Sequence, residues 1–282
     1  MKKVSRIKTI GIFYREDNSA AKLWAAKIKS WIGKKHPRVK IVEKRPEALI
    51  VLGGDGTILE AAGRYQNVKP ILVGLNLGHV GFLASVREPA KFFRALEKFF
   101  SHQYWVVEKM MLEASVWRNG KSVFSTNSLN DIVVQNPLGM VEIEVGIEDH
   151  PLQFIRGTGA LVATATGSTA QNLSAHGPIV MPSIECLILT ELFDHNIPTP
   201  SIVIDQDKSV TLKILNFRKR GVLTIKKTGK PADVLLVSGD STIFPLNKGD
   251  VIKIRRSHRL VKFAELEKNY FFKSLQEKFA FR

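Results

Sequence analysis

One carboxylate stands among glycines, directly after a fully apolar segment in the N-terminal half of the chain. Residues 48–52 read Ala-Leu-Ile-Val-Leu, and Gly-Gly-Asp-Gly-Thr follows at 53–57. Glycines let a phosphate approach the backbone, and a helix beginning near Thr57, with Thr57 as its N-cap, would offer unpaired N–H groups. Asp55 would repel a phosphate, so it indicates an acceptor for a substrate hydroxyl proton or a contact made through a cation. A tight turn with a solvated aspartate is the structural alternative.

The turn at 53–57 differs from two well-defined phosphate-binding motifs. The Gly-Lys-Ser at 120–122 has Ser115 where a Walker A loop needs its first glycine, and it lies in a predicted hairpin rather than before a helix. No Gly-x-Gly-x-x-Gly dinucleotide fingerprint occurs in the sequence.

Three later segments also place small or polar residues at strand ends. The stretch 74–83 holds three glycines and Asn76, which indicates a ligand-facing loop or a glycine-rich connection. Asn130 and Asp131 precede a strand and have the groups to bind an adenine edge or ribose hydroxyls, although such pairs are common in turns. Residues 164–174 combine hydroxyls and a glycine at a helix start, which suits phosphate or ribose or forms an ordinary cap.

Apolar strands alternate with amphipathic helices in the first hundred residues. This alternation predicts an open α/β sheet, and the run at 48–52 indicates a strand buried on both faces of a parallel sheet. Ser19 is the expected N-cap of the first helix and Gly33 its end, with Trp24 and Trp31 on its core face. The expected strands cover 8–14, 39–42, 48–52 and 70–75, and the helices 19–33, from 57 onward, and 89–99.

After about residue 105 the pattern changes to short strands with polar turns, which predicts a β-rich domain. Asn119-Gly120, between apolar segments, is the strongest short-range hairpin signal. Helices are expected here only at 168–173 and 182–193, followed by a terminal helix at 265–279. The expected strands are 110–117, 122–125, 132–134, 141–146, 161–164, 201–204, 210–214, 221–225 and 234–237.

The composition excludes several classes of protein. The 282 residues are 44% hydrophobic and 24% charged, which is typical of a globular chain. No uninterrupted apolar run reaches the ~18 residues that span a bilayer, and the apolar stretch after the basic start is too short for a signal peptide. Cys186 is the single cysteine, so an intrachain disulfide or a cysteine metal cluster is excluded. We therefore expect a cytoplasmic protein without a membrane partner.

The net charge is concentrated at the two ends of the chain. There are 42 Lys and Arg against 26 Asp and Glu, a formal charge of +16, of which residues 1–50 hold +10 and residues 248–282 hold +6. Basic ends indicate a phosphate-rich partner such as nucleic acid, a membrane surface or a nucleotide. A lysine-rich, solvated surface is the alternative.

Taken in order, these segments resemble the NAD kinase family, whose members transfer the γ-phosphoryl of ATP to the 2′-hydroxyl of the adenosine ribose of NAD. A Gly-Gly-Asp-Gly-Thr run alone also occurs in lipid kinases and phosphofructokinases, so the ordered set carries the resemblance. The matching segments are 52–59, 76–83, Leu129-Asn130-Asp131, Thr166–Ala170 with Leu173-Ser174 and Gly177-Pro178-Ile179, Pro182-Ser183, Asp240, Phe244-Pro245-Leu246, Gly249-Asp250 and Asn269-Tyr270-Phe271.

The resemblance implies a two-domain fold with the NAD site between the domains. An α/β domain with an open Rossmann-like parallel sheet would cover 1–104, a β-rich NAD-binding domain 105–262, and a C-terminal helix at 263–282 would return to the first domain. It further implies Mg²⁺ or another divalent cation with ATP, polyphosphate as a possible donor, and a homodimer or homotetramer. Both basic ends would then lie on one lobe, where their field favours ATP or polyphosphate over nucleic acid.

The resemblance also assigns roles to residues. Asp55 would activate the 2′-hydroxyl, Asn130 and Asp131 would hold adenosine, and Arg156 would lie near the nicotinamide half. Phe82 would give an apolar contact, beside an adenine and ribose pocket formed by the hydroxyl-rich segment. The implied binding residues, none of them a metal ligand, are Gly54, Gly56, Thr57, Asn76, Phe82, Asn130, Asp131, Arg156, Thr158, Thr166, Thr169, Ala170, Gln171 and Ser174.

The sequence departs from the family pattern at several places. Thr158 stands where the family has an aspartate thought to orient the nicotinamide side, and Gln171 replaces the usual tyrosine. Ala165 replaces a proline, and the late Asp-Gly-Gln reads Asp-Ser-Thr at 240–242. The catalytic aspartate is intact, so we expect an active enzyme, and the changed nicotinamide side leaves its preference between NAD and NADH open.

Two other functions compete with this interpretation. A lipid or other small-alcohol kinase could use the same aspartate turn, but the matched Asn76, Asn130 and 166–174 argue against it. A non-catalytic module could bind NAD or nucleic acid, and nucleic-acid binding would need basic residues interleaved with aromatic ones on a sheet or helix face. The helical spacing of Trp24 and Trp31 favours a core face instead.

Overall fold

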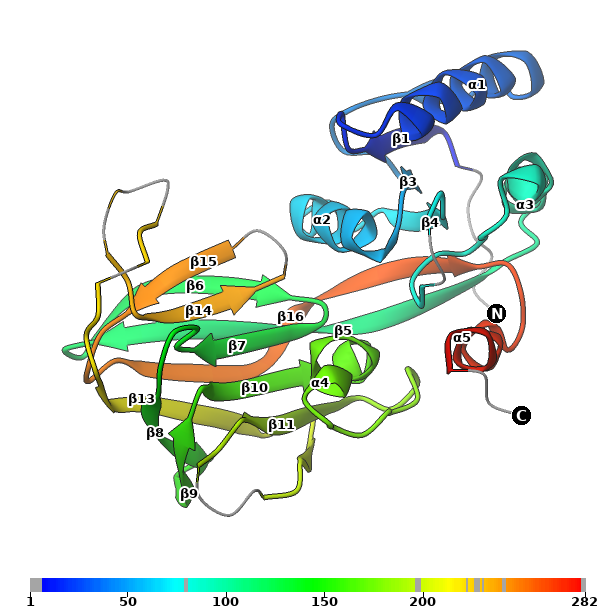
Figure 1. The fold of residues 1–282 in the computed structure, drawn as a ribbon. Coiled ribbons are helices and arrows are strands. Elements are labelled where there is room, and N and C mark those ends of the chain that lie inside the picture. The colour runs from blue at the N-terminus through cyan, green and yellow to red at the C-terminus, as the bar shows by residue number, and fades with distance from the viewer. Residues whose placement is uncertain are drawn as a thin grey trace. The chain divides into compact units, whose positions relative to one another are not determined.

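The computed structural model describes residues 7–78, 81–195, 199–221, 223–225, 229, 231–239 and 242–279 (Figure 1). The chain forms two compact units. The first unit comprises residues 1–109 and 259–282, and the second comprises residues 110–258. Two long strands, β5 (Trp105–Arg118) and β16 (Val251–Glu265), contribute residues to both units.

The first unit is built on a parallel sheet. Its order is β2 (Lys40–Ile41), β1 (Thr9–Tyr14), β3 (Ala48–Leu52), β4 (Ile71–Leu75) and the end of β16, and each of these pairs is parallel. All five residues of β3 are fully buried, as a strand covered on both faces of a sheet requires.

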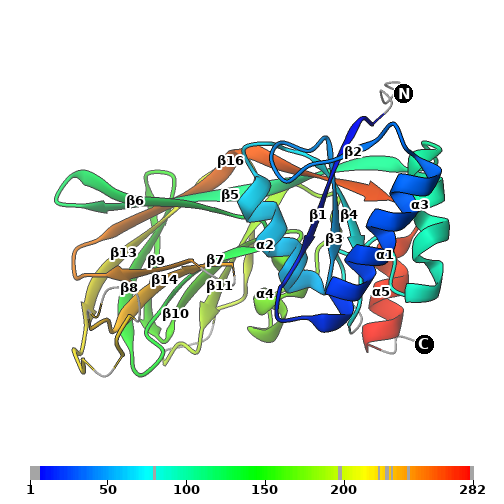
Figure 2. The same cartoon turned by 90° about the horizontal axis from the view of Figure 1, so that it is seen from above.

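Helices cover both faces of this sheet. Figure 2 shows α1 (Ser19–Lys35) and α3 (Phe92–Phe100) on one side of the strands and α2 (Asp55–Tyr65) on the other. A short 3₁₀ turn, η1 (Pro89–Lys91), precedes α3, and α5 (Tyr270–Phe279) is the last helix of the described chain. The expected core face of α1 is confirmed, because Trp24 and Trp31 pack on the aromatic rings of α3.

The ends of two helices differ from the sequence prediction. Asn18, not Ser19, caps α1, because its Oδ1 accepts a hydrogen bond from the Ala21 N–H at 3.0 Å. The helix continues through Gly33 to Lys35. The terminal helix begins only at Tyr270, since the chain up to Glu265 completes β16.

The second unit contains two antiparallel sheets around one core. One sheet has the order β16, β13 (Ser209–Phe217), β8 (Val141–Ile147) and β9 (His150–Gly157), with the hairpin of β5 and β6 (Lys121–Ser128) beside β16. The other has the order β12 (Ile202–Asp205), β11 (Cys186–Leu192), β10 (Gly159–Thr164), β7 (Asp131–Gln135), β14 (Val234–Ser238) and β15 (Thr242–Leu246). Buried aliphatic side chains from both sheets form a shared core. The short η2 (Gly167–Thr169) and α4 (Gln171–Ser174) follow β10.

The helix predicted over 182–193 is wrong. Residues Cys186–Leu192 form β11, which pairs antiparallel with β10 on one side and β12 on the other. A short apolar run of this kind fits a buried helix and a central strand equally well by pattern alone. Of the strand predicted at 221–225, the described part shows Thr224 in an isolated bridge with Pro231, and Val222 lies outside the described residues.

The fold class predicted from the sequence is confirmed. An α/β unit with a parallel sheet carries the aspartate turn, and a β-rich unit follows it in the chain. The C-terminal helix belongs to the first unit. Within the described chain, no helix has both the length and the apolar character to span a membrane.

A buried ion pair holds the start of β16 in the second unit. The side chain of Asp250 is fully buried, and its two oxygens accept hydrogen bonds from Nε and Nη2 of Arg118, both at 2.8 Å. The Asn247 N–H donates a third bond to Asp250 at 2.8 Å. The hydrogen bond to Asp250 raises the pKa of Arg118 above its ordinary value.

Arg118→Met should destabilise the protein by about 3 kcal/mol, because the Asp250 carboxylate would stay buried without its counter-charge. Urea unfolding followed by circular dichroism measures this loss. Arg255→Met is the matched control: its exposed pair with Glu113, at 3.4 Å, should contribute less than about 1 kcal/mol. Equal effects of the two substitutions would contradict the prediction.

Candidate active site

The aspartate turn connects β3 to α2. The Gly53 N–H donates to the Leu75 carbonyl oxygen of β4 at 3.1 Å, which ties the turn to the neighbouring strand. Gly53 has φ of +152°, and a Cβ there would lie 2.5 Å from Oγ1 of Thr57. This position therefore requires glycine.

Thr57 is not the N-cap that the sequence predicted. The N-cap is Gly54, with extended backbone angles, and α2 begins at Asp55. Thr57 lies inside the first turn and is buried, because the tight turn brings its side chain against Gly53. Asp55 consequently occupies the first helical position, where the helix dipole stabilises a negative charge.

Two backbone N–H groups hold the carboxylate of Asp55. The Phe82 N–H donates to Oδ2 at 2.7 Å, and the Leu83 N–H donates to Oδ1 at 3.2 Å. Each oxygen thus receives one bond and keeps lone pairs for another donor. The sequence predicted Asp55 and Phe82 as parts of one site, and the structure shows the Phe82 N–H bonded directly to the Asp55 carboxylate.

Gly81 makes this contact possible, and sequence reasoning did not single it out as a required residue. A Cβ on Gly81 would lie 2.2 Å from Oδ1 of Asp55, which is far inside van der Waals contact. Three glycines in the segment 74–83 were the available signal, but only the structure shows which one faces the carboxylate. His79 and Val80 of this segment lie outside the described residues.

The loop that supplies these N–H groups is anchored to two strands. The N–H groups of Ser85 and Val86 both donate to the Gly74 carbonyl oxygen of β4, at 2.8 and 3.1 Å. Oγ of Ser85 donates to the Ala264 carbonyl oxygen of β16 at 2.7 Å. Asn76, predicted as a ligand contact, is fully buried, and its Oδ1 accepts the Gly78 N–H at 2.7 Å. Through this bond Asn76 stabilises the conformation of the loop.

In the second unit, the Asn130 turn lies against the segment after β10. The Thr164 N–H donates to the Asn130 carbonyl oxygen at 2.8 Å, and Oγ1 of Thr164 donates to that of Leu129 at 2.7 Å. A Cβ on Gly167 would lie 2.2 Å from the Asn130 carbonyl oxygen. The two predicted adenosine-binding segments, 130–131 and 166–170, are therefore neighbours.

Oδ1 of Asn130 is buried and has no hydrogen-bond partner among the described residues. Buried polar atoms are nearly always paired in folded proteins. An unpaired amide oxygen here, beside the hydroxyl-rich turn, is suited to accept a hydrogen bond from a bound ligand. Asp131, next in the chain, is also buried, and its N–H bonds to Oγ of Ser128 at 3.2 Å.

Two buried polar residues that were not predicted as site residues, Ser168 and Asn172, support the turn of η2 and α4. Ser168 is fully buried, and its Oγ donates to the Ala165 carbonyl oxygen at 2.7 Å and accepts the Val180 N–H at 3.1 Å. Asn172 is also fully buried and bonds to the Pro178 carbonyl oxygen and to Thr190. The predicted residues Thr166 and Ala170 remain partly accessible, Gln171 and Ser174 are exposed, and Thr169 is buried.

The residues predicted near the nicotinamide half flank the connection of β9 and β10. Arg156 is exposed and lies 3.7 Å from the carboxylate of Glu142. Thr158 is half-buried, and its Oγ1 donates to the Leu192 carbonyl oxygen at 2.8 Å. Because a threonine hydroxyl is neutral, Thr158 supplies no negative charge at the connection of β9 and β10. Asp240 and Ser241 of the altered late motif lie outside the described residues.

The two units differ sharply in charge. The first unit holds 27 Lys and Arg against 12 Asp and Glu, a formal charge of +15, and the second holds 15 against 14. Among the described residues, no three His, Cys, Asp or Glu side chains gather where they could hold a metal ion.

Family models match most of the chain. Residues 10–104 match the model described as the ATP-NAD kinase N-terminal domain, and residues 129–266 match the ATP-NAD kinase C-terminal domain. The NAD kinase of Natranaerobius thermophilus is 35% identical over 234 residues, covering 82% of this chain and 77% of the relative. The NAD kinase of Heliobacterium modesticaldum is 31% identical over 291 residues, covering 96% and 98%.

Solved structures share the fold. Yeast NADH kinase in complex with NADH superposes with a TM-score of 0.87 at 18% identity, covering 99% of this chain and 89% of that one. An NAD kinase from Archaeoglobus fulgidus in complex with ATP gives a TM-score of 0.73 at 21% identity, covering 96% and 97%. With both family domains matched in order and relatives above 30% identity over most of its length, this chain belongs to the NAD kinase family.

Proposed function

We propose that this protein transfers the γ-phosphoryl of ATP to the 2′-hydroxyl of the adenosine ribose of NAD, forming NADP. Asp55 is the residue that accepts the hydroxyl proton. The observation that carries this proposal is the carboxylate of Asp55 at the first position of α2, held by the N–H groups of Phe82 and Leu83. Their bonds fix its orientation and leave lone pairs for a substrate hydroxyl.

The chemical step needs a positioned acceptor more than a strong base. As the ribose oxygen bonds to the γ-phosphorus and the bond to the leaving ADP breaks, the hydroxyl proton passes to Asp55. The two N–H donors and the dipole of α2 stabilise the carboxylate in the correct orientation. Nearby N–H groups at the start of α2, including those of Gly54 and Gly56, are available to phosphate oxygens.

The adenosine end of NAD is assigned to the second unit. The unpaired Oδ1 of Asn130 accepts from the amino group of adenine or from a ribose hydroxyl, and the carboxylate of Asp131 offers further acceptors. Thr166, Thr169 and Ala170 lie on the segment that packs against the Asn130 turn, and we assign them to the same adenosine site. Gln171 and Ser174 lie one turn further on and are exposed.

The donor is a polyanion, ATP or polyphosphate. The formal charge of +15 in the unit that carries Asp55 attracts such a donor over a distance set by ionic strength. A divalent cation such as Mg²⁺ is proposed to arrive on the phosphates of ATP. Mg²⁺ there would screen the phosphate charge.

The exposed apolar residues of β9 support a homodimer or homotetramer. In the sheet order, β9 is a terminal strand, and Leu152 and Phe154 on it are 40% and 48% exposed. Apolar side chains on an edge strand favour association with another chain. A cytoplasmic location remains part of this proposal.

Asp55→Asn should lower kcat at least ~10²-fold, the scale of lost general-base assistance. The amide keeps the size of the side chain but cannot take the proton. A coupled assay of NADP formation from NAD, with ATP and polyphosphate as alternative donors and no lipid present, measures it. Near-normal turnover of Asp55→Asn would show that another group accepts the proton.

Gly81→Ala should lower kcat about 10²-fold, because the new Cβ would displace the Asp55 carboxylate by roughly 1 Å. Gly63→Ala is the matched control. Gly63 lies inside α2 with open space around it, so alanine should leave kcat within about twofold and stabilise the helix by about 0.5–1 kcal/mol. A similar kcat for both variants would contradict the assigned contact.

Thr158→Asp should raise the preference for NAD over NADH, as a ratio of kcat/KM values, about tenfold. The nicotinamide ring is positively charged in NAD and neutral in NADH, so a carboxylate nearby discriminates between them. Thr158→Asn adds no charge and should leave the ratio within about twofold. An unchanged ratio in Thr158→Asp would place this residue away from the nicotinamide.

A further inference from the structure

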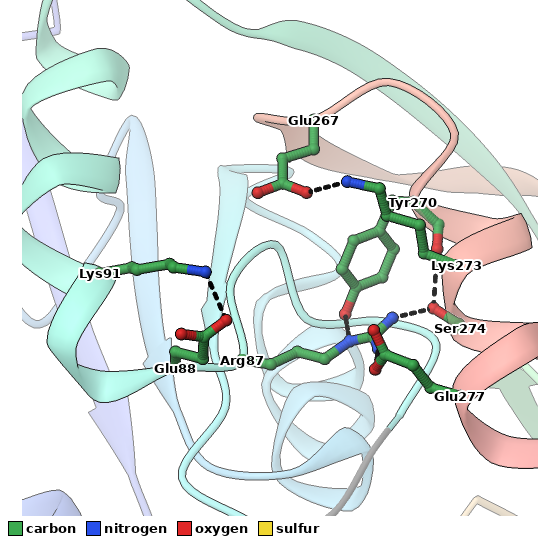
Figure 3. A network of polar contacts seen from close by, with 8 residues as sticks. All are labelled: Arg87, Glu88, Lys91, Glu267, Tyr270, Lys273, Ser274 and Glu277. Atoms are coloured by element: carbon green, nitrogen blue, oxygen red, sulfur yellow. Dashed lines mark hydrogen bonds and ion pairs between the residues drawn. The ribbon is translucent and has the colours of Figure 1, made fainter.

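The loop that holds Asp55 continues directly into a second network, which binds it to the C-terminal helix. Arg87 follows Leu83 by four residues and is largely buried, with 15% of its side chain exposed. Figure 3 shows its guanidinium pointing at three side chains of α5. Nε donates to Oη of Tyr270 at 3.0 Å, and the two terminal nitrogens bond to Ser274 and Glu277.

These contacts are specific to an arginine. The guanidinium carbon also lies 4.5 Å from the centroid of the Tyr270 ring, so one side chain makes a cation–π contact and three hydrogen bonds, one of which is also the ion pair with Glu277. A lysine has a single ammonium and cannot meet these acceptors together. Ser274 is fully buried, and its Oγ also donates to the Tyr270 carbonyl oxygen at 2.8 Å.

The same helix covers Phe82, whose N–H donates to Asp55. The ring of Phe82 lies 5.9 Å from that of Phe271 and 6.3 Å from that of Phe279. The ammonium of Lys278 stands 5.0 Å above the Phe82 ring. The loop is thus held by α5 at two points, Phe82 and Arg87, on either side of the residues that bond to β4 and β16.

The environment of Tyr270 places α5 within electrostatic reach of the site. Burial raises the pKa of Tyr270, Arg87 offsets part of that rise through its hydrogen bond and positive charge, and the negative charge of Asp55 adds a smaller increase. The oxygen of this phenol accepts the hydrogen bond from Nε of Arg87.

We propose that Arg87 is a positioning residue for phosphoryl transfer: by binding α5 it fixes the loop whose Phe82 and Leu83 N–H groups orient the carboxylate of Asp55. This inference rests on the proposed role of Asp55. Arg87 acts only through the loop and does not itself touch the substrates. Its loss lets the two N–H donors move, and a general base displaced by a fraction of an ångström loses turnover rather than substrate affinity.

A double-mutant cycle tests the proposal in the full-length enzyme. Arg87→Gln should lower kcat about tenfold, with KM for NAD and ATP within about twofold. In the Asp55→Asn background the same substitution should lower kcat less than about twofold, because no carboxylate remains to be positioned. Arg87→Lys, which keeps the charge, should recover part of the loss, and Tyr270→Phe should lose an intermediate amount.

Neighbouring side chains provide matched controls. Glu88 pairs with Lys91, and Lys273 on α5 pairs with Glu267; Figure 3 draws both pairs beside the Arg87 network. Glu88→Gln and Lys273→Gln each remove one exposed charge from the same two segments. Both should leave kcat within about twofold.

Hydrogen–deuterium exchange separates positioning from general destabilisation. In Arg87→Gln, the amides of residues 82–86 should exchange at least about fivefold faster, while those of β1 and β3 keep their wild-type protection. Faster exchange throughout the first unit would overturn the proposal, as would equal kcat losses in the two Asp55 backgrounds or a kcat within twofold of wild type. Near-normal turnover of Asp55→Asn alone would instead overturn the proposed role of Asp55.

Discussion

The contact between the Asp55 carboxylate and two backbone N–H groups requires a particular arrangement of the strands, helix and loop of the first unit. For the N–H groups of Phe82 and Leu83 to reach Asp55, the ends of β3 and β4 must be adjacent, as their parallel pairing makes them. The helix must begin at Asp55 rather than later, so that the carboxylate faces the loop. Gly81 must lack a Cβ, and the loop must be fixed to β4 and β16.

In the second unit, internal hydrogen bonds hold the segments around Asn130 in place. Among its described residues, the buried Oδ1 of Asn130 has no hydrogen-bond partner, and such an atom needs a rigid frame. Ser168, Asn172 and Thr190 form that frame through hydrogen bonds that are satisfied within the protein. The backbone of Asn130 is fixed by Thr164 and by the close approach of Gly167. Oδ1 of Asn130 can therefore remain buried and available.

The sequence predicted those features that depend on local pattern. The strands β1, β3 and β4 follow from apolar runs, and glycine-containing segments follow β3 and β4. It did not predict β11, because seven mostly apolar residues fit a central strand or a buried helix, and the pairing with β10 and β12 decides between them. Thr57 was a reasonable N-cap by residue type, but the approach of its side chain to Gly53 places it within the helix. The contacts of Arg87 with α5 span more than 180 residues, a separation at which no spacing rule applies.

The difference in formal charge between the two units agrees with their proposed roles. Under the proposed function, the first unit attracts a phosphoryl donor and gains from its formal charge of +15, whereas a second unit that binds NAD through hydrogen bonds and shape needs no such charge. Part of the excess positive charge at the C-terminal end is structural, since the ammonium of Lys278 lies over the rings of Phe82 and Phe279. Arg87 serves the structural purpose alone, because Glu277 neutralises its charge and its guanidinium connects α5 to the loop at Asp55. A positive charge that is fully paired contributes little to the field, so its value to the enzyme lies in the fixed direction of its hydrogen bonds.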